Sequence, residues 1–413
     1  MPEEAYVWVW LPLHHDPVVC GVVRPRGAGP EHDFTYGRSY LERPGALPLA
    51  PELPLVSGRQ RPNVGLDVAG VLLDGTPDSW GRRVVNERVL GRRDRDSEPS
   101  DLSLLTYMLE SGSDRIGALD FQASPSTYLP RTVDSEATLE QLLHAAEMLE
   151  EGEEMPTSLS DALLLGSTVG GARPKALIRD GDRRFIAKFP STTDQLPYVR
   201  YEAVAMELSR RAGIETARTD IVRTAGRDVL LVERFDRRAD GGRRMQLSAA
   251  TILGLNPERA VGAMSYVDLA ERIRADFDDP SETLVELFRR IVLNVLVRNT
   301  DDHARNHAAF WDGRGLNLTP AYDVTSSHGR IDSVASHPMS IAPGDNRSLL
   351  AVCVRAAPVF HLTSTRAHEL IDELVGVVQD HWSDAADAAH LTQGQRQALW
   401  QTSILNPAIW WEA

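Results

Sequence analysis

The two lysines of this chain constrain its fold more than any other feature. The sequence has 413 residues, and among its 44 basic residues only Lys175 and Lys188 are lysine. They flank Asp180-Gly181-Asp182, a strong signal for a tight β-hairpin turn. A two-residue turn at either place in this tripeptide puts both lysines on one face of the hairpin. Because lysine supplies a compact charge where the forked arginine does not fit, both side chains are predicted to face one anionic group.

A glycine-rich loop comes directly before this hairpin. Residues 166–175 have the sequence GSTVGGARPK, in which the glycines would let backbone N–H groups approach phosphates closely. The loop is not a Walker A motif, because the Gly-Lys-Ser/Thr ending and the following helix are both absent. It is closer to the glycine-rich loop of kinases, which covers the phosphates from a hairpin. The sequence therefore predicts a nucleotide-phosphate site here.

A second motif, NTDDHARN at residues 299–306, carries the candidate chemistry. Asp301 is followed by Asn306 and, further on, by Asp323. This is the set that metal-assisted phosphoryl transfer needs, with one carboxylate facing the acceptor hydroxyl and an amide and a second carboxylate sharing Mg²⁺. We therefore predict Asp301 as the catalytic residue and the other two as metal ligands.

Two alternatives remain open for this motif. Asp301 or Asp302 could simply cap a helix or form a turn, as aspartates in loops commonly do. Asp301, Asp302 and His303 could also be ligands of a hydrolytic metal, although adjacent residues on one turn seldom converge on one ion.

The regions around these motifs are predicted to place them. Residues 279–282, Asp-Pro-Ser-Glu, have the N-cap, first-turn proline and acidic residue that begin a helix, which leads into the 299–306 motif. A helix from Tyr201 carries Glu202, which either pairs with Lys188 or is a solvated first-turn glutamate. The strand at 228–236 corresponds to a kinase hinge. Further elements are predicted as helices at 139–151, 365–379 and 394–403 and as a hairpin at 308–320.

We predict an α+β fold in three segments. Residues 1–123 form a strand-led module, with strands at 6–11 and 17–23 and a returning strand at 115–121. Residues 124–238 carry the glycine-rich loop and hinge, and residues 239–413 are mostly helical. This division corresponds to an N-terminal module followed by the two lobes of a kinase.

Composition limits the partners and the compartment. A net charge of -15 argues against sequence-blind adhesion to nucleic acid, so contact with DNA would come through a partner. The acidic N-terminus and the lack of a long apolar run indicate neither a signal peptide nor a membrane anchor. Two cysteines far apart in the sequence fit a reducing compartment. We expect a soluble, cytoplasmic protein that does not bind membranes.

Taken in order, these motifs resemble those of the HipA family of serine/threonine kinase toxins from bacterial toxin-antitoxin modules. The resemblance covers nearly the whole chain. It rests on Phe34-Thr35-Tyr36, Leu47-Pro48-Leu49, the segments at 72–82 and 116–119, Gly170-Gly171-Ala172-Arg173-Pro174-Lys175, the segment at 232–237, the 299–306 motif and Tyr322-Asp323-Val324. Two positions depart from the family pattern: Arg305 stands where lysine is frequent, and Thr168 where the loop phosphosite is often serine.

The resemblance implies an atypical protein-kinase-like fold with ATP and Mg²⁺ as cofactors. Asp301 would be the catalytic aspartate, Asn306 and Asp323 the metal ligands, and Lys188 the lysine on the ATP phosphates. It further implies that the loop, the hinge and the catalytic motif bind the nucleotide through Thr168, Val169, Gly170, Gly171, Lys175, Glu233, Arg234, Phe235 and His303. The expected site of autophosphorylation is Thr168 or else the adjacent Ser167.

The resemblance also implies partners and a biological role. The partner would be a HipB-like helix-turn-helix antitoxin, through which DNA is contacted, and the substrate would be a protein, expected to be an aminoacyl-tRNA synthetase. Phosphorylation of that target would inhibit translation and growth. Two other functions are kept as alternatives: a small-molecule kinase, and a catalytically silent corepressor bound to an antitoxin.

Overall fold

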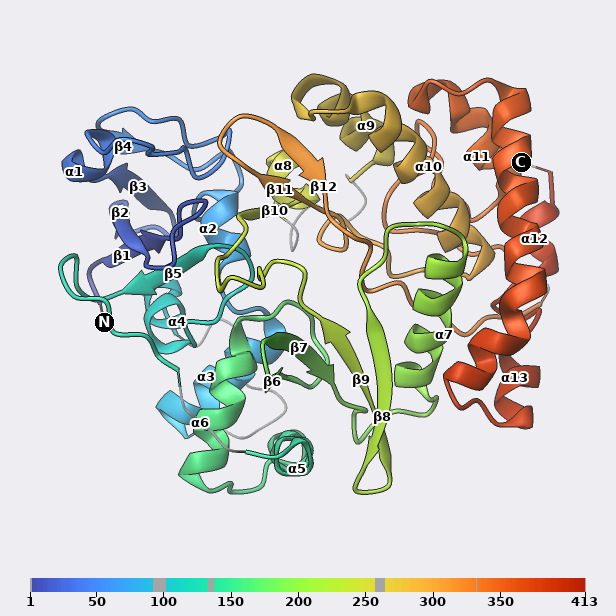
Figure 1. Cartoon of the computed structure of the whole chain (residues 1–413), viewed down its shortest axis with the longest axis horizontal. Coiled ribbons are helices and arrows are strands. Elements are labelled where there is room, and N and C mark those ends of the chain that lie inside the picture. The colour runs from blue at the N-terminus through green and yellow to red at the C-terminus, as the bar shows by residue number, and fades with distance from the viewer. Residues whose placement is uncertain (1, 92–101, 133–136, 257–263, 332, 413) are drawn as a thin grey trace. The chain divides into compact units, whose positions relative to one another are not determined.

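The computed structural model describes residues 2–91, 102–132, 137–256, 264–331 and 333–412 (Figure 1). Two compact units make up the chain. The N-terminal unit comprises Met1–Gln195, Val222–Leu247 and Trp311–Arg314, and the C-terminal unit comprises Leu196–Ile221, Ser248–Phe310 and Gly315–Ala413. No helix among the described residues is long and apolar enough to cross a membrane.

The N-terminal unit begins with a five-stranded sheet in the order β4-β3-β2-β1-β5. All four strand pairs are antiparallel. Its strands are β1 (Ala5–Val9), β2 (Val18–Pro25), β3 (His32–Tyr36), β4 (Arg59–Gln60) and β5 (Leu119–Gln122). The first two strands confirm the prediction. The returning strand begins only at Leu119, because Gly117 before it has φ +77°, outside the extended region.

Four helices belong to the described residues of this part of the unit. They are α1 (Arg38–Leu41), α2 (Gly70–Asp74), α3 (Ser79–Leu90) and α4 (Leu104–Glu110). Trp80 and Val84 of α3 are buried in a hydrophobic cluster together with Leu143 and Leu163, which lie on two later helices. The N-terminal module is therefore packed into the same core as the segment that carries the glycine-rich loop.

A second sheet, in the order β6-β7-β9-β8, carries the two lysines. Its strands are β6 (Lys175–Asp180), β7 (Arg183–Lys188), β8 (Thr219–Thr224) and β9 (Arg227–Glu233). Helix α5 (Leu139–Glu151) has the predicted bounds and begins with a capping box between Thr138 and Gln141. Helix α6 (Thr157–Leu165) and the 3-10 turn η1 (Gly166–Thr168) were not predicted.

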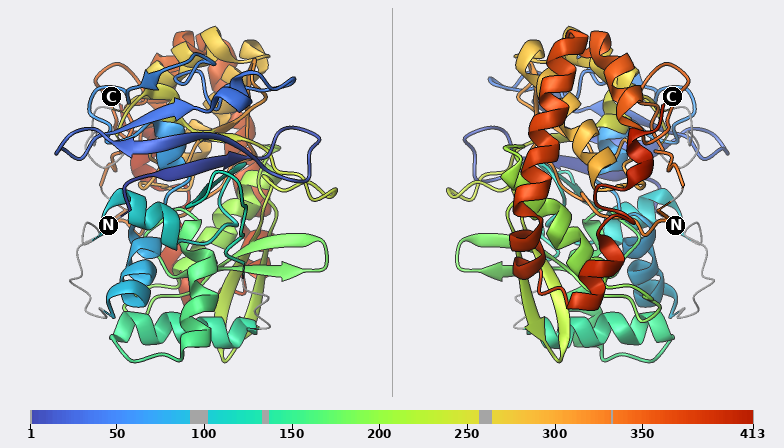
Figure 2. Two further views of the ribbon diagram at one scale, coloured as in Figure 1. Left: turned by 90° about the vertical axis from the view of Figure 1, so that its left-hand side faces the viewer. Right: turned by 90° about the vertical axis from the view of Figure 1, so that its right-hand side faces the viewer.

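The C-terminal unit is mainly helical, as predicted. Its helices are α7 (Tyr198–Arg211), α8 (Ala249–Leu253), α9 (Tyr266–Asp276), α10 (Pro280–Leu296), α11 (Leu350–Ala356), α12 (Ser364–Ala388) and α13 (Gln393–Leu399), with 3-10 turns η2 (Ala357–Phe360) and η3 (Pro407–Trp410). The long α12, drawn in red, packs against α7 and α10 (Figure 2). The predicted helix at 365–379 is thus the first part of a longer one.

Helix α10 begins as the sequence predicts. Asp279 is its N-cap, and the carboxylate Oδ1 accepts a hydrogen bond from the Glu282 N–H at 3.1 Å. A third, three-stranded sheet has the order β10-β11-β12, with β10 at Gln246–Ser248, β11 at Ala308–Trp311 and β12 at Leu316–Leu318. The last two strands are the hairpin predicted at 308–320.

Candidate functional site

The register of the β6–β7 hairpin confirms that the two lysines share a face. Lys175 lies directly opposite Lys188, and the turn is formed by Gly181 and Asp182, with Gly181 at φ +58°. Directly opposed residues of an antiparallel pair project from the same side. Lys188 is half-buried, whereas Lys175 is only 2% exposed. The two lysines are therefore adjacent but differ in their access to solvent.

Lys175 holds the glycine-rich loop itself in this structure. Its Nζ donates a hydrogen bond to the Gly170 carbonyl oxygen at 2.6 Å. Gly171 has φ +111°, and a Cβ atom there would lie 2.4 Å from this Nζ atom. Any side chain at position 171 would therefore strain the backbone and push the lysine away. Gly170 and Gly171 are both exposed, so the loop presents bare backbone at its tip.

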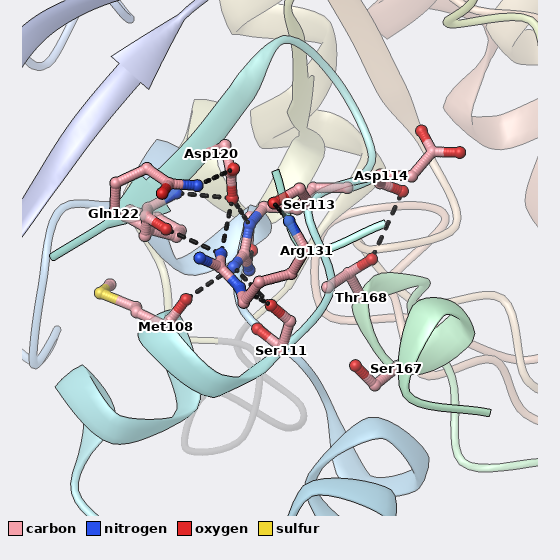
Figure 3. A network of polar contacts seen from close by, with 12 residues as sticks. Met108, Ser111, Ser113, Asp114, Asp120, Gln122, Arg131, Ser167 and Thr168 are labelled. Carbon is pink, nitrogen blue, oxygen red and sulfur yellow. Dashed lines mark hydrogen bonds and ion pairs between the residues drawn. The ribbon is translucent and has the colours of Figure 1, made fainter. Parts of the chain in front are cut away.

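The hydroxyls of Ser167 and Thr168 both point into the protein. Ser167 donates to the Leu164 carbonyl oxygen at 2.5 Å. Thr168 donates to the Asp114 carbonyl oxygen at 3.4 Å, as Figure 3 shows. The two residues are 0% and 1% exposed, respectively. Neither hydroxyl is placed to receive a phosphate without a movement of η1.

Asp114, whose carbonyl oxygen accepts the Thr168 hydrogen bond, is itself held by two arginines through its carboxylate. The Asp114 carboxylate accepts from Arg237 at 2.5 Å and is paired with Arg234 at 3.1 Å. Burial opposes its charge, but Arg234 and Arg237 outweigh this effect and lower the pKa of Asp114 far below its usual value. Neighbouring Arg115 is buried and paired with Asp120 at 2.8 Å. These charges fix the 114–120 segment beneath the loop.

The predicted hinge residues are tied into this same structure. Glu233 pairs with Arg183 at 2.8 Å on the sheet surface. The Arg234 N–H donates to the Arg184 carbonyl oxygen at 2.8 Å, and its buried side chain binds Asp114 and Asp236. The amide of Arg234 is therefore engaged by the sheet in this structure. Contact of Glu233 and Phe235 with adenine stays a prediction. The pairing of Glu202 with Lys188 also stays a prediction, because Glu202 lies in the C-terminal unit and Lys188 in the N-terminal unit.

In the C-terminal unit, the end of α10 leads directly into the 299–306 motif. Arg298 has φ +56°, in the left-handed region, and reverses the chain after the helix. The Asn299 side chain then donates to Asn294 Oδ1 at 3.1 Å and accepts from the Asp301 N–H at 3.4 Å. Asn299 thus anchors the loop to the last turns of α10.

Asp301 is exposed and lies close to two other carboxylates. Partial burial by the surrounding loop raises its pKa, Asp323 and Asp302 raise it further, and His303 acts in the opposite direction. Asp323 has φ +57°, and the preceding Tyr322 donates from its hydroxyl to the Arg305 carbonyl oxygen at 2.7 Å. The downstream aspartate is therefore brought beside the loop, as predicted.

Asn306 is tied to the motif through its side-chain amide, and its role as a metal ligand stays a prediction. Its Nδ2 donates to the Asp301 carbonyl oxygen at 3.0 Å, and its own N–H donates to the His303 carbonyl oxygen at 2.8 Å. With the nitrogen side of the amide turned to the loop, Oδ1 is the atom available as a metal ligand. An amide oxygen and the Asp323 carboxylate are hard oxygen donors of the kind that Mg²⁺ prefers.

Asp302 has a different role from its neighbour. It is buried, and its Oδ2 accepts hydrogen bonds from the Tyr266 hydroxyl, from Asn294 Nδ2 at 2.7 Å and from His307 Nε2 at 3.0 Å. Burial by itself would raise its pKa, but His307 and these hydrogen bonds outweigh that effect and lower it. Asp302 is thus a structural anchor beneath the loop.

This geometry excludes the alternative of a hydrolytic metal held by Asp301, Asp302 and His303. The carboxylate of Asp302 is turned into the protein, away from any ion that its neighbours could share. In the described ranges, no group of three or more histidine, cysteine, aspartate or glutamate side chains could hold a metal ion. A divalent ion at Asn306 and Asp323 would therefore take its further oxygens from water and from a ligand such as a nucleotide.

Sequence reasoning missed the residues that support the loop. Tyr266 begins α9, Asn294 lies within α10, and His307 directly follows the motif. His337 also belongs to this group, since burial lowers its pKa to about 4 while the Asp302 charge raises it. A polar Asn294 on the apolar face of a core helix was the one signal that could have indicated a buried polar contact.

Comparison with known proteins identifies the family. Residues 167–382, just over half of the chain, match the HipA-like C-terminal domain. The putative kinase Y4mE of Sinorhizobium fredii is 27% identical over 332 residues, covering 71% of this chain and 72% of that protein. The serine/threonine-protein kinase toxin HipA of Shewanella oneidensis is 28% identical over 185 residues, covering 38% and 43%.

A solved structure confirms the predicted fold class. HipA in the Shewanella oneidensis complex of HipA, HipB and operator DNA matches with a TM-score of 0.70 at 19% sequence identity, over 96% of this chain and 95% of that one. The match extends from the N-terminal module through the helical C-terminal part. The chain therefore belongs to the HipA family, with a HipA-like C-terminal domain and the fold of HipA.

Proposed function

We propose that this protein is an ATP-dependent serine/threonine protein kinase. The observation that carries the proposal is the arrangement in the C-terminal unit, where Asp301 is exposed, Asn306 binds the Asp301 carbonyl oxygen through its amide nitrogen and Asp323 lies close by. The names of the related kinases support the same activity. The phosphate-binding residues would be Lys188 and the exposed backbone of Gly170 and Gly171.

The reaction would depend on the chain in three ways. Asp301 would orient the acceptor hydroxyl and take its proton, and a raised pKa makes it a stronger base than an ordinary aspartate. Asn306 and Asp323 would hold Mg²⁺, which supplies charge neutralisation on the phosphates when bound. Lys188 would stabilise the transferred phosphoryl group as a point charge. Asp302 would hold Asp301 in place from below.

The test is transfer of labelled γ-phosphate from ATP in a lysate of the host organism, with Mg²⁺ present. The proposal expects labelling of a protein band on serine or threonine, and mass spectrometry would identify it. We further propose that this target is an aminoacyl-tRNA synthetase, whose inactivation would inhibit translation and growth. Labelling of a sugar or an antibiotic instead would favour a small-molecule kinase, and no transfer at all would favour a silent corepressor.

We also propose a small helix-turn-helix antitoxin resembling HipB as the partner. The support is the solved complex of the related HipA with HipB and operator DNA. The net charge of -15 agrees with DNA contact through such a partner and not through this chain alone. Gel-shift measurements with the operator should show no specific complex for the isolated chain and a supershift when the antitoxin is added.

Autophosphorylation at Thr168, or else Ser167, is proposed as an inhibitory event. Both hydroxyls are buried, and Thr168 faces the Asp114 carbonyl oxygen, so a phosphate with nearly two negative charges does not fit this packing. The modified η1 would have to turn outward and leave the loop unable to cover the nucleotide. Mass spectrometry after incubation with Mg-ATP tests this idea, and a phosphorylated form that retains full activity would refute it.

A further inference from the structure

Helix α3, far from the kinase motifs in sequence, lies in backbone contact with the start of the glycine-rich loop. A Cβ atom built on Gly81 would lie 1.8 Å from the Ser167 carbonyl oxygen and 2.8 Å from Pro77 Cβ. No side chain of any kind fits there unless the helix and the loop separate. Because glycine is unfavourable within a helix relative to alanine, its presence at this position has a packing reason.

Trp80, the residue before Gly81, contacts the other end of the glycine-rich loop. The Trp80 indole N–H donates to the Lys175 carbonyl oxygen at 3.0 Å, and the side chain is 0% exposed. One turn of α3 therefore touches Ser167, near the start of the loop, and Lys175, the residue that ends it. The exposed tip at Gly170 and Gly171 lies between these two points in the sequence.

The loop has other attachments in both halves. In the first half, Ser167 donates to the Leu164 carbonyl oxygen and Thr168 donates to the Asp114 carbonyl oxygen. The second half is held by a separate set of contacts. Lys175 binds the Gly170 carbonyl oxygen, Arg173 forms an ion pair with Asp194, and the Phe189 N–H donates to the Pro174 carbonyl oxygen at 2.9 Å. The first half, η1, has α3 directly against its backbone. Contact with the backbone of α3 is thus one of the interactions that set the position of η1.

We propose that Trp80 and Gly81 are positioning residues for nucleotide binding, because they hold both ends of the phosphate-covering loop. This inference rests on the proposed function, since it assigns a role in ATP binding to a helix of residues 1–123. Helix α3 acts through the loop and does not touch the nucleotide itself. Moving η1 by the width of a methyl group displaces the N–H groups that would face the phosphates.

The main test compares Gly81→Ala with Gly376→Ala. Gly376 also lies within a helix, α12, but nothing lies within 4 Å of a Cβ atom built there, so it controls for the general effect of the substitution. We expect Gly81→Ala to raise the KM for ATP by about tenfold or more while kcat changes far less. Hydrogen exchange of residues 166–169 should become faster in this variant only.

Several outcomes would overturn the inference. A folded Gly81→Ala protein with the KM for ATP and the loop exchange rates of the wild type would do so, and so would equal effects in Gly376→Ala. Hydrogen exchange needs no activity, so it tests the contact even if the wild type transfers no phosphate. A wild-type protein that transfers no phosphate would refute the proposed function, whatever the exchange rates show about the contact.

A second variant covers the case in which Gly81→Ala does not fold. Trp80→Phe removes the indole N–H that binds Lys175 while keeping an aromatic ring in the core. We expect a smaller rise in the KM for ATP, about threefold, with faster exchange at residues 173–176. Wild-type affinity together with wild-type exchange rates in Trp80→Phe would contradict the proposal.

Discussion

At Asp302, one buried carboxylate oxygen accepts hydrogen bonds from Tyr266, Asn294 and His307. These three residues come from α9, from α10 and from the position just after the motif. The loop that carries Asp301 is therefore fixed to two helices through a single side chain. Loss of its charge would leave three buried polar groups with a poorer partner.

We predict that Asp302→Asn lowers the free energy of unfolding by about 2–4 kcal/mol and reduces phosphate transfer. Denaturant unfolding gives the measurement. Asp384→Asn is the control, because that carboxylate is exposed and its ion pair with Arg211 is 3.8 Å long. Equal stability in the two variants would show that Asp302 does not anchor the loop.

The loss of stability caused by Asp302→Asn should depend on pH. The pKa of Asp302 is lowered in the folded protein, so its contribution to the free energy of unfolding is present above its unfolded pKa of about 3.9. That contribution is lost as the pH falls through the lower folded-state value. The difference in stability between wild type and Asp302→Asn should therefore be largest near neutral pH and shrink in acid.

The substitution Lys188→Arg tests whether the nucleotide site needs a compact positive charge. We predict that Lys188→Arg weakens ATP binding by about tenfold or more, because a forked guanidinium is bulkier than an ammonium. Calorimetric titration with ATP and Mg²⁺ measures the affinity. Arg179→Lys, an exposed change on the same hairpin, should bind as the wild type does. Near-wild-type binding by Lys188→Arg would mean that the scarcity of lysine in the sequence has no bearing on this site.

Single side chains were predicted from the sequence only where they belong to a motif. Asp301, Asn306 and Asp323 lie in one unit and come together as expected, and the two lysines oppose each other in the hairpin. Tyr266 and His307 could not be predicted, because nothing in the sequence shows that they reach Asp302. Such contacts depend on the packing of helices, which a single sequence does not specify.

At the scale of elements, local signals predicted helices well where a cap is present. Helices α5 and α10 begin where Thr138 and Asp279 cap them. Helix α6 was missed because its N-cap residue is Pro156, which makes no side-chain cap, and because its apolar residues run directly into the glycine-rich loop. The role of α3 was also missed, since a glycine within a helix gives no sign of what lies against it.

We predict that Asp279→Ala lowers the free energy of unfolding by about 1 kcal/mol, because it removes the cap of the helix that leads to the catalytic motif. Phosphate transfer at a temperature where the protein stays folded should change little. Ser281→Ala, in the exposed first turn of the same helix, is the control. If both variants were as stable as the wild type, the hydrogen bond to Glu282 would have no energetic role.

At the scale of the whole molecule, each unit contains one buried free cysteine. Cys20 lies in the N-terminal unit and Cys353 in the C-terminal unit. Burial raises the pKa of the Cys20 thiol well above its usual value and that of Cys353 to about 12. Both thiols should therefore be unreactive in the folded protein.

We predict that a thiol reagent labels neither cysteine at neutral pH until denaturant is added, when both react. Mass spectrometry of peptides at increasing denaturant would show which unit opens first. A serine substitution at each position assigns the two signals. Rapid labelling of either thiol without denaturant would contradict the packing described for that unit.

The family and the overall fold were predictable because the motifs are specific and occur in a fixed order. The match to the HipA-like C-terminal domain and the full-length likeness to a solved HipA confirm both. The grouping into two units, in which α7 belongs with the C-terminal helices, differs from a simple division along the sequence. Long-range packing decides such groupings, and local patterns do not report it.

The most direct test of the central claim is phosphate transfer by Asp301→Asn. The account predicts a loss of about 10³ in rate, because the group that positions the acceptor hydroxyl is removed, while ATP affinity stays within a few-fold. Burial and the neighbouring carboxylates of Asp323 and Asp302 disfavour the charge of Asp301 and raise its pKa, so the variant should not lose thermal stability. Undiminished transfer by a stable Asp301→Asn protein would contradict the assignment of this loop as the catalytic site.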